Sequence, residues 1–204
     1  MKFLLLLICL LLPVRAHATM AEAITNMQTG RNAEALAEFR ILSRHGNPLA
    51  AYWLGSMYLY ARGVDKDVKE AMKWLHKSAK QNHAPAMSLL GSIHLSGQTG
   101  KVNVNLARGW FEKAAKEGDT FAMLKIGEMY TTGIGVLKNP KIGMRYIKRA
   151  AKGDLVEAMH VLGLAHIQGI GVKQDVRQAK FWLARAAKQG YEPSVEVLTE
   201  LEGE

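Results

Sequence analysis

The side chains best suited to chemistry in this sequence are seven histidines and a small set of serines, and neither set falls in a catalytic pattern. His160 and His166 are six residues apart, which places them on different faces of a helix, and no H-E-x-x-H or C-x-x-C motif occurs. A β-lactam-acting serine enzyme would need S-x-x-K, and no serine after residue 18 has a lysine three positions later. We therefore predict no enzyme activity, no catalytic residue, no metal ligand and no cofactor. A hydrolase acting on cell-wall or β-lactam substrates is the alternative.

The first eighteen residues have the pattern of a secretory signal peptide. Lys2 precedes an unbroken apolar run over residues 3–12, and Ala16-His17-Ala18 is a small-residue cleavage sequence. Ten apolar residues are too few to cross a bilayer, which takes about 20 in a helix. We expect cleavage after Ala18 and a periplasmic or secreted protein with no transmembrane segment in the mature chain. Initiation at Met20 is the alternative, and it would remove the signal.

Composition and charge limit the class of protein and the kind of partner. The 204 residues are 49% hydrophobic and 22% charged, which is typical of a globular protein and argues against a disordered chain. The formal net charge of +9 falls to +7 in the mature chain, because Lys2 and Arg15 lie in the signal. Cys9 is the only cysteine and also lies there, so the mature chain can form no disulfide. No arrangement of aromatic residues among the basic ones suggests base stacking, and together with export this argues against nucleic acid as a partner.

A period of 36 residues organises the rest of the chain. Glycine, alanine, aromatic and lysine positions all recur in phase through four units, with no insertion or deletion. Such a period predicts four copies of one supersecondary unit. The clearest columns are Gly55, Gly91, Gly127 and Gly163; Ala50, Ala86, Ala122 and Ala158; and Trp74, Trp110, Tyr146 and Trp182.

Each unit is predicted to be a pair of helices. In the first unit these cover residues 48–60 and 68–81, each with apolar residues spaced i, i+3/i+4, i+7. A turn at residues 61–64 ends the first helix, and an N-cap residue begins the second. Because glycine inside a helix costs about 1 kcal/mol, the recurring Gly55 column predicts close approach of the partner helix. The N-cap column is Asp67, Asn103, Asn139 and Asp175.

The same register extends beyond the four units. Residues 32–45 align with a second helix, residues 21–28 with a first helix, and the chain ends on another first helix through Ser194 and Leu198. Terminal units of a solenoid diverge because their outer faces meet water. The predicted organisation is a signal peptide at 1–18, a capping helix pair at 19–47, four repeats at 48–191 and a capping helix at 192–204.

The unit resembles the Sel1-like repeat, a relative of the tetratricopeptide repeat. Leu54-Gly55-Ser56-Met57-Tyr58 and the run from Ile134-Gly135-Val136 to Ala150-Ala151-Lys152 carry the resemblance. It implies an all-α, right-handed solenoid of antiparallel helix pairs that acts as an adaptor for another protein. The departures are Ala61 in place of a turn glycine, an irregular turn at residues 97–100, and Gly143 in place of alanine, which should weaken its helix locally. Because the mature chain would have no cysteine, it lies outside the disulfide-linked branch of that family.

By analogy with that family, the first helices line a concave groove. We expect contact residues where the units differ while the packing columns stay fixed, and we predict a protein or peptide partner with a bulky anchor against Tyr52 and Tyr60. The candidates are Tyr52, Ser56 and Tyr60 in the first unit, Ser88, Ser92 and Ser96 in the second, Leu124, Glu128 and Thr132 in the third, and His160, Leu164 and Gln168 in the fourth.

Basic residues also recur, near the end of each second helix. Cations there interact favourably with the helix dipole, which makes them a helix-terminating element. The alternative is a ridge that attaches the protein to an anionic envelope polymer. The residues are Lys77 and Lys80, Lys113 and Lys116, Arg149 and Lys152, and Arg185 and Lys188, with Lys148 in addition.

Overall fold

In the computed structural model, which describes residues 19–203, the chain forms eleven α-helices and no strand within that range. The predicted signal peptide at 1–18 lies outside the described residues. The helices are α1 (Met20–Gln28), α2 (Asn32–Arg44), α3 (Pro48–Tyr60), α4 (Val68–Ala79), α5 (Ala84–Leu95), α6 (Val104–Lys116), α7 (Thr120–Thr132), α8 (Pro140–Lys152), α9 (Val156–Gln168), α10 (Val176–Lys188) and α11 (Glu192–Gly203).

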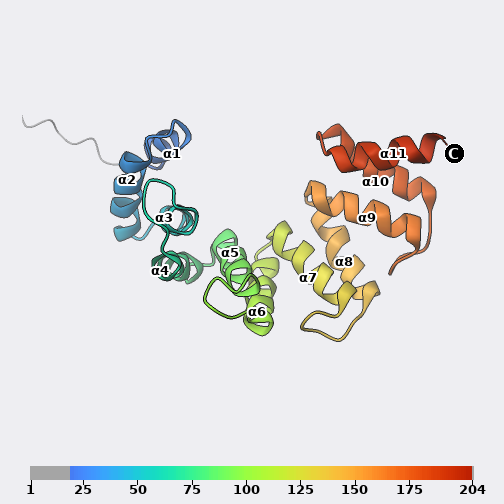
Figure 1. Cartoon of the computed structure of the whole chain (residues 1–204), viewed down its shortest axis with the longest axis horizontal. Helices are drawn as coiled ribbons and strands as arrows, with labels where there is room; N and C mark the ends of the chain where they lie inside the picture. Colours follow the sequence, from blue (N-terminus) through green and yellow to red (C-terminus); the bar gives the residue numbers. More distant parts are fainter. Residues whose placement is uncertain (1–18, 204) are drawn as a thin grey trace, which may run out of the picture.

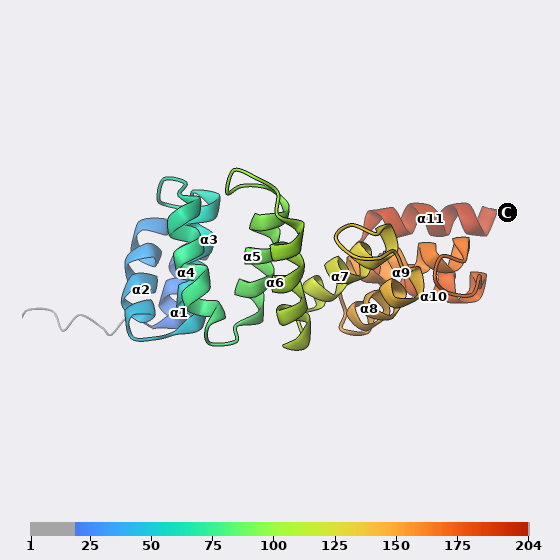
Figure 2. The same ribbon diagram turned by 90° about the horizontal axis from the view of Figure 1, so that it is seen from below.

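The helices pair and stack into a curved row, with α1 and α2 at one end and α11 at the other (Figures 1 and 2). Each helix packs mainly against the helices just before and after it in the chain. An elongated stack in which each pair meets only its neighbours is the architecture of a solenoid. The predicted all-α solenoid of antiparallel helix pairs is therefore confirmed. None of the described helices is long and apolar enough to cross a membrane.

The second helices of the repeats begin at the predicted capping residues. The side chains of Asp67, Asn103, Asn139 and Asp175 each accept a hydrogen bond from the backbone N–H three residues later. These bonds measure 2.9–3.1 Å and satisfy amide groups that have no partner inside the helix.

The first helices end in a left-handed residue, as the turn glycines predict. Gly133 closes α7 with φ 87° and Gly169 closes α9 with φ 71°. Ala61 takes the same conformation after α3, with φ 55°, although it carries a Cβ. After α5 the turn is irregular, as expected: Ser96 stays right-handed and Gly97 takes the positive φ.

The glycine column lies where the two helices of each repeat approach most closely. A Cβ added to Gly55 would lie 2.7 Å from the Cγ atom of Leu75, and one added to Gly127 would lie 2.5 Å from Cγ1 of Ile147. Gly127 is also opposite Gly143, whose carbonyl oxygen would be 2.9 Å from that Cβ. Gly143 therefore does more than weaken α8, because its missing side chain lets α8 approach α7.

Candidate functional site

Three successive first helices together line a hollow of about 280 Å³ on the solenoid. Helices α3 and α5 each contribute one face, and the start of α7 closes the third side. The site therefore spans three repeats. Its lining residues are Tyr52, Tyr60, Pro85, Ser88, Leu89, Ser92, Asp119 and Phe121.

Aromatic side chains dominate the exposed part of the hollow. Tyr60 is 55% exposed and Phe121 is 40% exposed, which is unusual for side chains of this size. Tyr52 is half-buried and is fixed by its neighbours, since its ring centroid lies 5.2 Å from that of Trp53 and 5.2 Å from that of His83. The hollow thus offers rigid aromatic area to a ligand.

Asp119 is the one charged residue among those that line the hollow. Its Oδ1 atom accepts a hydrogen bond of 2.8 Å from the hydroxyl of Ser88 and one of 2.7 Å from the backbone N–H of Ala122. The same residue therefore caps α7 and connects it to α5. A negative charge is held in a fixed place beside the aromatic wall.

Burial also sets the protonation of the groups around the hollow. Burial raises the pKa of Tyr52, the nearby Tyr60 and Asp119 raise it further, and Arg62 opposes the shift. Burial lowers the pKa of His83, while Asp119 acts in the opposite direction. At neutral pH both rings are therefore uncharged.

The structure brings together four of the predicted groove residues, namely Tyr52, Tyr60, Ser88 and Ser92. It adds Pro85, Leu89, Asp119 and Phe121, which were not predicted. A signal for all four exists in the sequence, because their columns also vary between units. The column of Asp119 holds Asn47, His83 and Leu155, and that of Phe121 holds Leu49, Pro85 and Glu157.

The other predicted groove residues do not line the hollow. Ser56 is 5% exposed, as is Ser88, but it is not among the residues that line the hollow, and its role as a contact residue stays a prediction. Several of the others bond within the structure: Glu128 pairs with Lys125 at 2.8 Å, and the hydroxyl of Ser194 lies 2.9 Å from Nδ1 of His160. The full set outside the hollow is Ser56, Ser96, Leu124, Glu128, Thr132, His160, Leu164 and Gln168.

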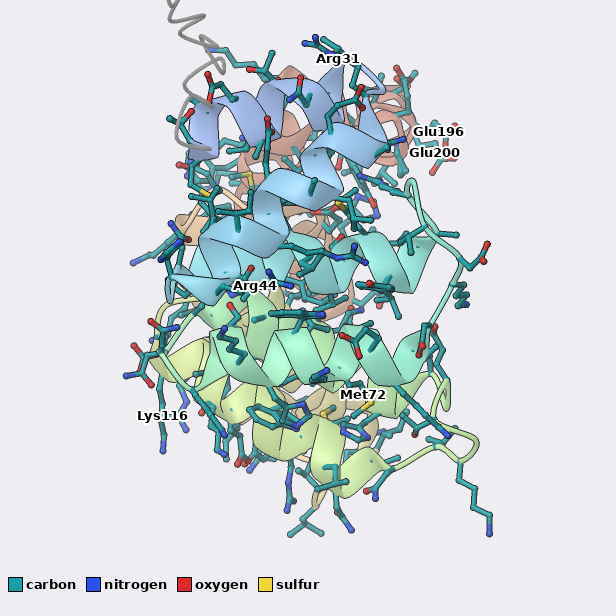
Figure 3. All side chains as sticks on the ribbon, turned by 90° about the vertical axis from the view of Figure 1, so that its left-hand side faces the viewer. Arg31, Arg44, Met72, Lys116, Glu196 and Glu200 are labelled. Atoms are coloured by element: carbon teal, nitrogen blue, oxygen red, sulfur yellow. The ribbon has the colours of Figure 1, made fainter. Side chains whose placement is uncertain are left out.

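The repeated basic residues have a structural partner that the sequence analysis did not anticipate. The first cation of each pair lies over the aromatic ring three residues earlier in the same helix. The charge-to-centroid distances are 5.4 Å for Lys77 and Trp74, 4.6 Å for Lys113 and Trp110, 5.9 Å for Arg149 and Tyr146, and 5.3 Å for Arg185 and Trp182. The second cation, such as Lys116, is exposed at the helix end (Figure 3).

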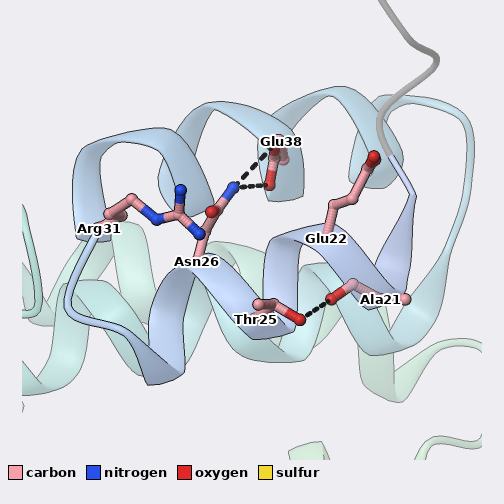
Figure 4. Close-up of a pocket in the computed structure, with 6 residues that line it drawn as sticks. All are labelled: Ala21, Glu22, Thr25, Asn26, Arg31 and Glu38. Atoms are coloured by element: carbon pink, nitrogen blue, oxygen red, sulfur yellow. Dashed lines mark hydrogen bonds between the residues drawn. The ribbon is translucent and has the colours of Figure 1, made fainter.

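A second hollow, of about 400 Å³, lies between α1 and α2 and was not predicted (Figure 4). Its lining is polar, and Asn26 donates to both carboxylate oxygens of Glu38 at 3.0 Å. Glu22 and Arg31 complete its polar rim. The bond between Asn26 and Glu38 links the two helices of the terminal pair. Across residues 19–203, no three His, Cys, Asp or Glu side chains gather in a way that could hold a metal ion.

Comparisons with known proteins agree with this architecture. The sequence profile of the family described as Sel1 repeat matches residues 48–83, 84–119, 120–155 and 156–191. A Sel1 repeat protein from Oxalobacter formigenes is 28% identical, with a TM-score of 0.81 over 89% of this chain and 79% of that protein. No curated protein sequence matches the chain.

Two further solved structures are similar. A protective antigen of uropathogenic Escherichia coli with an SLR fold is 25% identical, with a TM-score of 0.74 over 87% of this chain. The chain spans 40% of the length of that antigen. The cysteine rich protein B of Helicobacter pylori is 22% identical, with a TM-score of 0.54 over 65% of this chain and 96% of that protein, which shows a shared fold alone.

Proposed function

The chain belongs to the Sel1 repeat family, and on that premise we propose that it is a non-enzymatic adaptor that holds a protein or peptide partner in the hollow between α3, α5 and α7. The observation that carries this proposal is the hollow itself. Three repeats contribute to it, and its two most exposed aromatic rings, Tyr60 and Phe121, leave much of their area open to solvent. Exposed aromatic side chains in a hollow are typical anchors of protein interfaces.

The chemistry of the hollow describes the partner. A volume of about 280 Å³ lies just below the range of small-molecule pockets, and it suits one or two side chains of a peptide. The rings of Tyr52, Tyr60 and Phe121 favour a bulky apolar or aromatic side chain. The carboxylate of Asp119 favours a hydrogen-bond donor or a positive charge next to it. We expect a segment that presents both features side by side.

Export is the second part of the proposal, and the residues at 1–18 support it through their signal-peptide pattern. The adaptor would then act in the periplasm or outside the cell. Fractionation of the native cell, together with N-terminal sequencing, tests this part. A mature protein that begins at Thr19 is the expected result, and an unprocessed cytoplasmic protein would contradict it.

Crosslinking followed by capture from the native cell tests the adaptor function. We expect the double variant Tyr52→Ala/Tyr60→Ala to lose its partner, with affinity reduced about 1,000-fold, because aromatic anchors buried at an interface contribute about 2 kcal/mol each. Phe181→Ala is the matched control, since Phe181 is 51% exposed on α10, away from the hollow.

The proposed site is wrong if the double variant is folded and still captures the same partner. Circular dichroism of each variant separates loss of binding from loss of structure. Covalent labelling of the purified chain by a fluorescent penicillin would instead support the hydrolase.

A further inference from the structure

The exposed apolar side chains of this protein are concentrated at one position of the repeat. Among the eleven large hydrophobic residues exposed within the described chain, six lie in the loop between the two helices of a repeat or in the first turn after it. Singly scattered apolar residues are normal on a protein surface, but a concentration of them marks an interaction site. The six residues are Val102, Leu106, Ile134, Leu137, Ile170 and Val176.

Leu137 is the most exposed of them, at 91%, so almost its entire side chain lies in water. The equivalent positions in the other repeats hold Asp65, Lys101 and Lys173, which are ordinary solvent-exposed residues. Nothing in the packing of the repeat requires a leucine here. Its exposure costs solubility without contributing to the core, so a surface that covers it would stabilise it.

The loops of successive repeats meet and form one continuous edge. In the third repeat the loop packs on the start of α6, where Gly135 contacts Val104. The carbonyl oxygen of Gly135 accepts a hydrogen bond of 2.8 Å from Nη1 of Arg108. Gly171 contacts the carbonyl group of Pro140 at the start of α8 in the same way. Figure 2 shows the loops after α3 and α5 projecting on the same side. We call residues 96–106, 133–145 and 169–176 the loop edge.

The central part of the loop edge is also positively charged. Residues 96–106 and 133–145 contain no aspartate or glutamate. The cations there are Lys101, Lys138, Lys141 and Arg145, and none of the four forms an ion pair with the described residues. Unlike the repeated lysines that stack on tryptophan, these charges are left for an external partner.

We propose that the loop edge is a peripheral membrane-binding surface that recognises anionic phospholipids. Ile134 and Leu137 would enter the interface between headgroups and acyl chains, while Lys138 and Lys141 meet the negative headgroups. Apolar insertion combined with several basic residues provides the two signals that stable peripheral attachment needs. The apolar residues are spread over three loops and the helix turns that follow them, and none of them lines either hollow, which suits a fluid bilayer better than a protein partner of fixed shape. This surface is separate from the hollow, so the proposal does not depend on the adaptor function.

Flotation of the full chain with vesicles tests the proposal. One set of vesicles is phosphatidylcholine alone and the other contains phosphatidylglycerol as well. We expect binding to the anionic vesicles that weakens as salt is added. Leu137→Ser should reduce the affinity about tenfold, because a buried leucine side chain contributes on that order. Lys138→Glu/Lys141→Glu should reduce it about 25-fold or more, because each lysine near an anionic surface contributes about fivefold.

Matched variants on other surfaces complete the design. Ile41→Ser removes an exposed apolar side chain from α2, and Lys80→Glu/Lys116→Glu reverses two exposed lysines at helix ends away from the loop edge. Both controls should retain most of the binding.

Three outcomes would overturn the proposal. Wild-type protein that fails to bind anionic vesicles contradicts it directly. Equal binding by all five proteins would assign the attachment to some other segment, including residues 1–18. Sedimentation velocity that shows a dimer converted to monomer by Leu137→Ser, with no vesicle binding, would assign the loop edge to a second copy of this chain.

Discussion

Two glycine-to-alanine substitutions in this protein should change stability in opposite directions. Gly127 lies in α7 and Gly109 lies in α6, both inside a helix with ordinary helical backbone. Alanine is favoured over glycine by about 1 kcal/mol in a helix interior, so helix propensity alone predicts that both substitutions stabilise. The surroundings differ: a Cβ at Gly109 would meet nothing within 4 Å, whereas one at Gly127 would lie 2.5 Å from Ile147 and 2.9 Å from the carbonyl oxygen of Gly143.

The size of the effect follows from these contacts. Overpacking a close contact costs about 1–3 kcal/mol, and the upper part of that range applies to Gly127 because the backbone of Gly143 cannot rotate away. After subtraction of the gain in propensity, Gly127→Ala should lower the free energy of unfolding by about 1–2 kcal/mol. Gly109→Ala should raise it by about 0.5–1 kcal/mol.

Urea unfolding followed by circular dichroism at constant temperature measures both values. Because solenoids can unfold in segments, the slope of the transition must be equal in the two variants before their midpoints are compared. Stabilisation by Gly127→Ala to the same degree as by Gly109→Ala would refute the close-approach explanation of the whole glycine column.

Three further predictions concern two helix caps and one half-buried histidine. Ala61→Gly should raise the free energy of unfolding by about 0.5–1 kcal/mol, because it removes the steric cost of a Cβ at a residue with left-handed backbone. Urea unfolding measures this change, and an unchanged midpoint would contradict it. Hydrogen bonds from the backbone lower the pKa of Asp175 below its ordinary 3.8. The charged carboxylate therefore stabilises the folded protein at neutral pH, and this stabilisation is lost as the pH falls through the pKa of the folded state. Asp175→Asn, which caps but does not titrate, should remove that acid-dependent loss in pH-dependent melting curves, and an unaltered loss would contradict it. Burial lowers the pKa of His160, so stability should fall as pH drops below 6.5, and NMR titration of the ring should give a value below 6.5.

The architecture could be predicted almost completely from the sequence. The helix at residues 48–60 begins and ends as predicted, and its partner ends at Ala79, two residues before the predicted end. The reason is that local rules set these boundaries: N-cap side chains, turn glycines and the apolar period all act within a single repeat. Gly143 shows where such rules fail, since its role depends on how closely α7 approaches α8.

The candidate site could be predicted only in part, because it is assembled across repeats. Asp119 and Phe121 belong to the third repeat but complete a hollow whose other walls are α3 and α5. The position of a residue within its own repeat does not show which residues of the neighbouring repeats lie close to it. Side-chain size is a second reason: in one predicted column Tyr52 and His160 are half-buried, while Ser88 and Leu124 are almost fully covered. That column lies at the border between the helix interface and the groove, so only the longer side chains reach out of it.

Residues that recur in every repeat stabilise this molecule, whereas the proposed binding surfaces consist of residues that do not recur. The repeated cations, such as Lys113, are held over aromatic rings of their own helix, and such contacts are worth about 0.5–1 kcal/mol at exposed sites. The recurrence of the first cation of each pair is thereby explained by stability. Both proposed binding surfaces are instead built from departures from the repeat: Asp119 and Phe121 at the hollow, and Leu137 on the loop edge. Because the fold needs only the repeated columns, these departures are where selection for a partner can act without loss of the solenoid.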